Sequence, residues 1–147
     1  MIIRKMTRQD IPGLLHLAQQ LARHVQDPDP RLDPKTLAEL AFTDPPWVEA
    51  LVAESDGQLL GLAAFSQSFE LHTNCRMLRL SDLVISDHAR GMGLGTALLH
   101  ALRDLARNRG CHEIRLELWL GNDQARKFYG KQTAEQLPEI ELWRLPL

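Results

Sequence analysis

Two long segments repeat apolar residues at intervals of three and four positions, the pattern of an amphipathic helix that packs on a core. The first predicts a helix over residues 11–25, and Thr7 with Asp10 approximates a capping box just before it. The second predicts a helix over residues 94–106, and Gly110 lies just beyond it, where glycine commonly ends helices. Each predicted helix has one apolar face to bury.

Two shorter helices are indicated by residues that favour helix starts. Pro34 suits the first turn of a helix, and it predicts a helix over residues 34–42 after a proline-containing loop over residues 26–33. Asn122 is a favoured helix cap, and it predicts a helix that reaches Tyr129. Helices are therefore expected near both ends of the chain as well as in its middle.

Strands are predicted where apolar residues alternate with polar ones or form short runs. Asp56-Gly57 is a strong hairpin signal between two of them, and residues 68–76 are expected to form a loop. The predicted strands cover residues 2–3, 47–54, 58–67, 77–86, 114–120 and 140–145. Helices interleaved with this antiparallel series indicate the α/β (α+β) class, with a mixed, mostly antiparallel sheet flanked by helices.

Composition and charge restrict the classes of function. The chain has 147 residues, which suits a single domain over residues 1–147, and 17 Lys and Arg against 19 Asp and Glu give a formal net charge of −2. This balance argues against a nucleic-acid partner. Two cysteines are too few for a disulfide framework, and no Cys/His cluster has the spacing of a metal site. Without a membrane-spanning stretch or a signal peptide, a soluble cytoplasmic protein is expected.

Glycine occupies every second position of a turn, at Gly91, Gly93 and Gly95, between an apolar run and a predicted helix. Glycine permits positive φ angles and lets a ligand approach the backbone without a side chain in the way. The start of the helix adds amides that have no partner inside the helix, together with the positive end of the helix dipole. The turn is therefore suited to binding phosphate, and Arg90 could add a charge-assisted contact.

The spacing of the glycines narrows the choice of phosphate ligand. A dinucleotide fingerprint that starts at Gly93 would need a small residue where the chain has Leu98, and a P-loop would need a lysine that this turn lacks. The pattern that remains is R-x-x-G-x-G over residues 90–95. A turn that only links a strand to a helix is the alternative.

This segment resembles the coenzyme-A pyrophosphate motif of the GNAT superfamily of N-acetyltransferases. A second family pattern, N-x-x-A-x-x-F-Y, is matched at the family's separation by Asn122, Ala125, Phe128 and Tyr129. The predicted order of elements also resembles the family's order, so the resemblance covers residues 2–130. It implies a GNAT-like fold with a splayed pair of cofactor-binding strands. It also implies transfer of an acetyl group from acetyl-CoA to a primary amine, by direct attack in a ternary complex.

The resemblance implies roles for individual residues. Backbone groups of residues 83–85 would meet the pantetheine arm of coenzyme A as an added strand would, amides of the turn would hold the pyrophosphate, and Asn122 would bond the arm near its thioester end. The cofactor-binding residues implied in this way are Leu83, Val84, Ile85, Arg90, Gly91, Met92, Gly93, Leu94, Gly95, Thr96 and Asn122.

Three further residues are candidates for the chemistry. An amine with a pKa of about 10.4 is almost entirely protonated at neutral pH, and only its neutral form attacks, so a base is useful. Glu117 is the candidate base, as in relatives that resemble ribosomal-protein alanine acetyltransferases, and a solvated or salt-bridged side chain without a catalytic role is the alternative. Tyr129 would donate a proton to the departing thiolate, or else only pack on the sheet. Asp82 would attract a cationic amine, or else accept a hydrogen bond from a nearby backbone turn.

Two departures from the family bear on the acceptor and on the C-terminus. Polyamine acetyltransferases commonly have an acidic residue where this chain has Ser81, which favours another small free amine as the acceptor. Thr133 stands where the family usually has a glycine before its last strands. A protein N-terminus or lysine is the alternative acceptor, and a non-catalytic acyl-CoA-binding sensor is the alternative function. Relatives commonly form homodimers.

Overall fold

The computed structural model describes residues 1–27 and 31–147, so the centre of the proline-containing loop predicted over residues 26–33 lies outside the described residues. The chain divides into two compact units, Met1–Glu117 and Leu118–Leu147. The first unit holds a sheet, its flanking helices and the glycine turn, and the second holds one helix and the C-terminal tail.

The first unit is built on a five-stranded sheet whose strands lie in the order of the chain. The strands are β1 (Ile2–Lys5), β2 (Glu49–Ser55), β3 (Gln58–Glu70), β4 (Cys75–Ile85) and β5 (Glu113–Leu116). The first three neighbouring pairs are antiparallel and the pair β4–β5 is parallel. The predicted mixed, mostly antiparallel sheet of the α/β (α+β) class is therefore confirmed.

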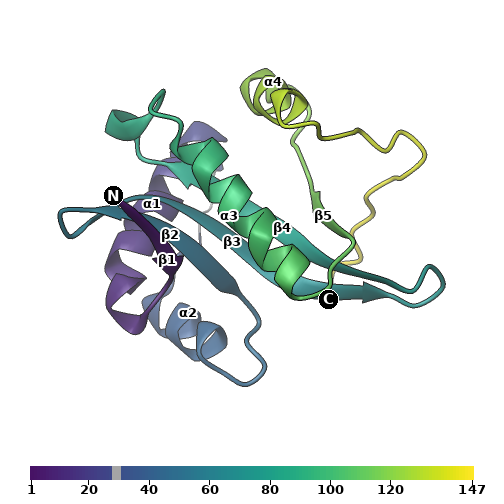
Figure 1. Cartoon of the computed structure of the whole chain (residues 1–147). Helices are drawn as coiled ribbons and strands as arrows, with labels where there is room; N and C mark the ends of the chain where they lie inside the picture. Colours follow the sequence, from purple (N-terminus) through teal and green to yellow (C-terminus); the bar gives the residue numbers. More distant parts are fainter. Residues whose placement is uncertain (28–30) are drawn as a thin grey trace. The chain divides into compact units, whose positions relative to one another are not determined.

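Helices cover both faces of this sheet. The helical elements are η1 (Arg8–Asp10), α1 (Ile11–His24), α2 (Pro34–Ala41), η2 (Asp87–Ala89) and α3 (Leu94–Asn108). α3 crosses in front of the strands and α1 lies behind them (Figure 1), in contact with β3 and β4. The capping box predicted at Thr7 and Asp10 is confirmed, and it begins the short 3-10 turn η1 that leads into α1.

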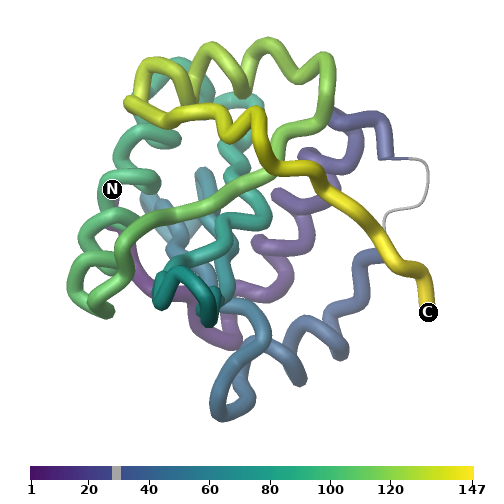
Figure 2. The backbone as a smooth tube through the Cα atoms, turned by 90° about the vertical axis from the view of Figure 1, so that its right-hand side faces the viewer, coloured from purple at the N-terminus to yellow at the C-terminus, as the bar shows by residue number. Residues whose placement is uncertain are grey.

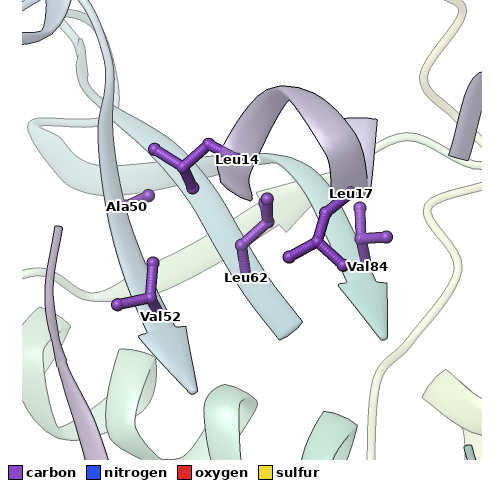
Figure 3. Close-up of a cluster of buried hydrophobic side chains, with 6 residues drawn as sticks. All are labelled: Leu14, Leu17, Ala50, Val52, Leu62 and Val84. Atoms are coloured by element: carbon purple, nitrogen blue, oxygen red, sulfur yellow. The ribbon is translucent and has the colours of Figure 1, made fainter. Parts of the chain in front are cut away.

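An apolar cluster joins α1 to the sheet (Figure 3). Its buried members are Leu14 and Leu17 of α1 with Ala50, Val52, Leu62 and Val84 of three neighbouring strands. Burying a side chain as large as leucine contributes about 1.5–3 kcal/mol, so this cluster is a main source of stability for the unit. Val84 anchors the last part of β4, and the core thereby fixes the strand that leads to the glycine turn.

β3 and β4 are longer than predicted. Their pairing continues to Glu70 opposite Cys75, so most of the loop predicted over residues 68–76 is strand, and only residues 71–74 form the turn. Asn74 takes a positive φ of 53° there. The prediction was wrong because ladder hydrogen bonds use backbone groups, and a polar hairpin arm can extend a ladder that begins in the core.

The second unit contains α4 (Asp123–Lys131), as predicted from its cap. The strand predicted over residues 114–120 is confirmed only as far as Leu116, and the strand predicted over residues 140–145 is wrong. Residues 118–120 and 140–145 are described and form no strand, and β5 ends at Leu116. Figure 2 shows the tail as an irregular yellow path to the C-terminus. Alternating apolar residues mark a possible face, but a strand also needs a neighbouring backbone, and the described residues include no such pairing for these segments.

Candidate functional site

The glycine turn leads from η2 into the first turn of α3, and its shape depends on two glycines. Gly91 and Gly93 both have a φ of +78°, which residues with a side chain rarely adopt. Within the described part of the chain, a Cβ atom added at either position would meet no heavy atom within 4 Å. The turn is therefore open on the side where a ligand would approach the backbone.

The start of α3 supplies donors to this turn. Gly93 is the cap of the helix, and its carbonyl accepts a hydrogen bond from the Ala97 amide at 3.0 Å. The amides of the next two residues, Leu94 and Gly95, have no acceptor within the helix because an α-helix leaves its first N–H groups unpaired internally. Together with the positive end of the helix dipole, these amides suit an anionic ligand.

Side chains next to the turn differ in what they can offer. Met92 is 69% exposed, whereas Leu94 is buried, so the amide is the group that Leu94 can present. Arg90 lies beside the turn with its guanidinium 2.9 Å from the carboxylate of Asp87. The Arg90 side chain is 40% exposed, and exposed ion pairs of this kind contribute only about 0–1 kcal/mol. A phosphate can therefore replace Asp87 as the partner of Arg90 with little loss of stability.

A β-bulge interrupts the pairing of β4 with β3. Phe65 pairs with Leu80 and Ala64 pairs with Asp82, so Ser81 is an extra residue in β4. The Ser81 hydroxyl donates to the carbonyl of Ala64 at 3.2 Å. Bulges of this kind change the direction in which neighbouring side chains point, and they are common next to active sites.

The pairing between β4 and β5 ends before β4 itself ends. Their parallel register ends with Leu80 opposite Leu116, while β4 continues to Ile85 with β3 as its partner. Among the described residues, the second part of β4 therefore pairs only with β3, and the separation of β4 from β5 is the splayed strand pair expected from the resemblance.

The alternation along β4 identifies the backbone groups on its open edge. The Ser86 amide donates to the carbonyl of Leu60, the residue before Gly61 in β3, at 2.9 Å. Since backbone groups of successive residues point to opposite edges, those of Val84 also face β3. Those of Leu83 and Ile85 then face away from β3, and these two residues are the ones able to pair with an extended ligand.

An ion pair lies where the two strands separate. Glu117 follows the end of β5, and its carboxylate accepts a hydrogen bond from Nη2 of Arg79 in β4. The two side chains are 50% and 45% exposed. Sequence reasoning selected Glu117 and, among the other acidic residues, the partly buried Asp82, but it missed Arg79. The partnership spans 38 positions and depends on the β4–β5 register, which no local pattern encodes.

The second unit carries the remaining predicted residues. Asn122 caps α4, with its side-chain oxygen accepting from the Ala125 amide at 3.1 Å, so the amide −NH₂ group is the part available to a ligand. Tyr129 lies on α4 and is buried, with its ring edge-on to Phe128 at a centroid distance of 5.1 Å. The catalytic role predicted for Tyr129 stays a prediction.

Two features of residues 1–27 and 31–147 bear on other kinds of function. No three His, Cys, Asp or Glu side chains in these ranges gather as they would around a metal ion. No helix in these ranges combines the length and the apolar character that crossing a membrane requires.

Comparisons with known proteins agree on one family. The family model described as "Acetyltransferase (GNAT) family" matches residues 14–133. Thialysine N-epsilon-acetyltransferase of Bos taurus is 25% identical over 151 residues, which span 97% of this chain and 88% of the relative. A solved structure of a probable acetyltransferase has a TM-score of 0.84 at 21% identity, covering 100% of this chain and 98% of that one. The ribosomal-protein-alanine N-acetyltransferase from Brucella melitensis biovar Abortus 2308 has a TM-score of 0.76 at 26% identity, covering 99% and 100%.

Proposed function

This chain belongs to the acetyltransferase (GNAT) family and is an acetyltransferase, and we propose that it moves an acetyl group from acetyl-CoA to a primary amine of a small molecule. We propose direct attack of the amine within a ternary complex. The match to the family model, over residues 14–133, extends into both compact units, which supports one catalytic domain over residues 1–147. A homodimer, as expected from relatives, is a further proposal.

The observation that carries this function is the continuity between the glycine turn and the open edge of β4. The turn offers amides and space to a pyrophosphate, and two positive-φ glycines keep that space free of side chains. Leu83 and Ile85 offer backbone groups to an extended arm, as a sheet edge does to a bound peptide. A phosphate site that continues into an unpaired strand edge fits coenzyme A, whose pyrophosphate is joined to the long amide-containing pantetheine.

The chain's own groups would divide the proton transfers. When bound, acetyl-CoA supplies the acetyl group as a thioester. Glu117, exposed at the strand separation, would take the proton that an ammonium must lose before it attacks. Tyr129 would hold a proton at its hydroxyl for the departing thiolate. Asp82, in the part of β4 beyond the bulge, would attract the cationic acceptor.

The class of acceptor is supported by the relatives. The name of the bovine relative describes acetylation of the side-chain amine of thialysine, a small amino acid, and that relative spans nearly the whole chain. A small free amine is therefore our first choice. A protein N-terminus is the second choice, because one solved neighbour is a ribosomal-protein-alanine N-acetyltransferase.

The deciding experiment is calorimetric titration with acetyl-CoA, comparing the unaltered protein with Gly93→Glu. The substitution brings bulk and negative charge into the turn, and we expect affinity to fall by at least 100-fold. Gly57→Glu is the matched control, because Gly57 has a φ of +76°, has open space around it and lies in the β2–β3 hairpin. Equal affinity in both variants would contradict the proposed phosphate site, and no binding to the unaltered protein would contradict the proposed function.

A second variant tests the catalytic step apart from binding. Tyr129→Phe should lower the release of coenzyme-A thiol by about 100-fold, the usual scale of general acid catalysis, with acetyl-CoA affinity nearly intact. Thermal unfolding of the variant checks that the buried ring still packs. Unchanged turnover would show that Tyr129 is not the acid.

A further inference from the structure

Three charged side chains share one face of the sheet because of the bulge in β4. Arg79 pairs with Ser66 and Asp82 pairs with Ala64, and these two β3 residues are two positions apart, so their side chains point to the same face. Without the extra residue Ser81, Arg79 and Asp82 would lie on opposite faces. Glu117 reaches the same face, since it contacts Arg79 directly. We call Arg79, Asp82 and Glu117 the splay cluster.

The splay cluster lies at the inner end of the open edge of β4. β5 stops pairing at Leu116, one residue before Glu117, and the open edge runs from there to Ile85 and the glycine turn. Ile85 lies four residues beyond Ser81, and a strand rises about 3.3 Å per residue, so the edge is roughly 13 Å long. An extended arm bound along this edge would bring its far end to the cluster.

Arg79 donates fewer hydrogen bonds to carboxylates than three other arginines of the first unit do. Among the residues that the structure describes, its guanidinium has one carboxylate partner, reached through one nitrogen, and the side chain is 45% exposed. Three other arginines of the first unit each donate at least two hydrogen bonds to carboxylates: Arg4 to Asp10 and Glu54, Arg109 to Glu49, and Arg115 to Glu70 and Glu113. Guanidinium groups bind carboxylates best through two parallel hydrogen bonds, which Arg79 retains the donors to make.

We propose that Arg79 binds a carboxylate on the acceptor, so that the favoured acceptors are primary amines that carry a carboxylate, such as amino acids with a side-chain amine. This inference rests on the proposed function. The acceptor carboxylate replaces Glu117 as the partner of Arg79, and Glu117 with Asp82 becomes available to the ammonium end of the same molecule. No covalent bond changes in this exchange.

The charges of the splay cluster suit such a molecule. One guanidinium and two carboxylates match an amino acid with one carboxylate and two ammonium groups, charge for charge. A diamine without a carboxylate would leave Arg79 competing with it for Glu117. The Arg79–Glu117 pair is about half exposed, and exposed ion pairs contribute little to stability, so an acceptor carboxylate can displace Glu117 readily.

The test compares two acceptors that differ by one group, lysine and cadaverine, which is lysine without its carboxylate. Their affinities are measured by calorimetry with coenzyme A present, which carries no acetyl group and so permits no turnover. KM values with acetyl-CoA provide a second measurement. The variants are Arg79→Gln and, as a matched control, Arg107→Gln, whose guanidinium pairs with Asp104 at 2.9 Å on the exposed side of α3. Lysinamide, in which the carboxylate is a neutral amide, is a third acceptor.

We expect the unaltered protein to prefer lysine over both cadaverine and lysinamide, and Arg79→Gln to reduce that preference by about 10- to 100-fold, the scale of hydrogen bonds between charged groups. Arg79→Lys should recover part of it, and Arg107→Gln should keep it whole. Acetyl-CoA binding without any preference for lysine, or a preference that survives Arg79→Gln, overturns this inference alone. Failure of acetyl-CoA to bind overturns the proposed function as well.

Discussion

Two arginine–glutamate pairs in the first unit have opposite surroundings. Arg109, just after α3, donates two hydrogen bonds to Glu49 of β2 at 2.7 and 2.6 Å, and both side chains are about 20% exposed. The same guanidinium lies over the ring of Phe65 at 5.7 Å, and its hydrogen bonds lower the pKa of the Glu49 carboxyl. The Arg79–Glu117 pair uses one nitrogen and is about half exposed.

The difference separates charges that hold the fold from charges that are available to a ligand. The Glu49 pair sits where β2 pairs with β3, with both side chains mostly buried, and removal of either member would leave a partly buried charge without a partner. The Glu117 pair sits where β4 and β5 separate, and water or a ligand can replace either member. Substitutions in the first pair should change stability, and substitutions in the second should change activity.

The largest effect is expected from Glu117→Gln. If Glu117 takes the proton from the acceptor, its loss should reduce kcat by about 100-fold or more, while the melting temperature changes little. The loss should be smaller with acceptors whose amines have lower pKa values, since more of such an amine is already neutral. Steady-state kinetics over a series of amines, together with thermal unfolding, measures both properties.

Glu113→Gln is the matched control for this change. Glu113 lies four residues earlier on the same side of β5, and it also pairs with an arginine, Arg115. It should retain nearly full activity. A similar fall in kcat for both variants, or a large loss of stability in Glu117→Gln, would remove the distinction between the two kinds of pair.

Glu49→Gln should have the opposite signature. Loss of the charge leaves Arg109 partly buried without its counterion, and we expect about 2 kcal/mol lower stability, or a melting temperature roughly 4–8 °C lower. Activity at temperatures well below unfolding should not change. Glu39→Gln is the control, because Glu39 is exposed and lies 4.0 Å from Lys35 across one helical turn. Urea denaturation of both variants gives the comparison.

Sequence alone predicted the local features of the fold and the site better than it predicted the contacts between distant strands. The glycine turn, the cap at Asn122 and the order of the elements could be predicted because each is encoded within a few neighbouring residues. The bulge at Ser81 and the contact between Arg79 and Glu117 depend on how distant strands align, and a shift of one residue would undo both. The prediction of a strand over residues 140–145 was wrong for a related reason, because alternating apolar residues do not specify a neighbouring strand with which the backbone can pair.

The Arg4–Asp10 pair is a second ion pair that stabilises the fold, and its contribution should depend on pH. The Asp10 carboxylate accepts two hydrogen bonds from Arg4 at 2.7 and 2.8 Å and one from the Thr7 amide, and the Arg4 bonds are the main cause that lowers its pKa from 3.8 to about 2. Because the folded-state pKa lies below the unfolded one, this carboxylate stabilises the fold above about pH 4, and the contribution disappears as the pH falls towards 2.

Asp10→Asn tests this contribution, which is at most about 2 kcal/mol. The variant should be less stable than the unaltered protein at pH 6, and the difference should shrink as the pH falls from 4 to 2. Urea denaturation at several pH values follows that convergence. A difference in stability that stays constant down to pH 2 would show that the Asp10 carboxylate is not the titrating group.

The smallest effect is expected for the stability of Arg79→Gln, and it tests the comparison from the other side. Arg79 and Glu117 lie in solvent on the same face as Asp82, so removing the guanidinium also leaves two carboxylates near each other, in water that screens them. We expect a change of no more than about 0.5 kcal/mol, smaller still at high salt. Thermal unfolding at low and high ionic strength measures it. A loss of stability near 2 kcal/mol, independent of salt, would show that this pair is structural like Glu49–Arg109. An acceptor carboxylate could then displace Glu117 only with a large loss of stability.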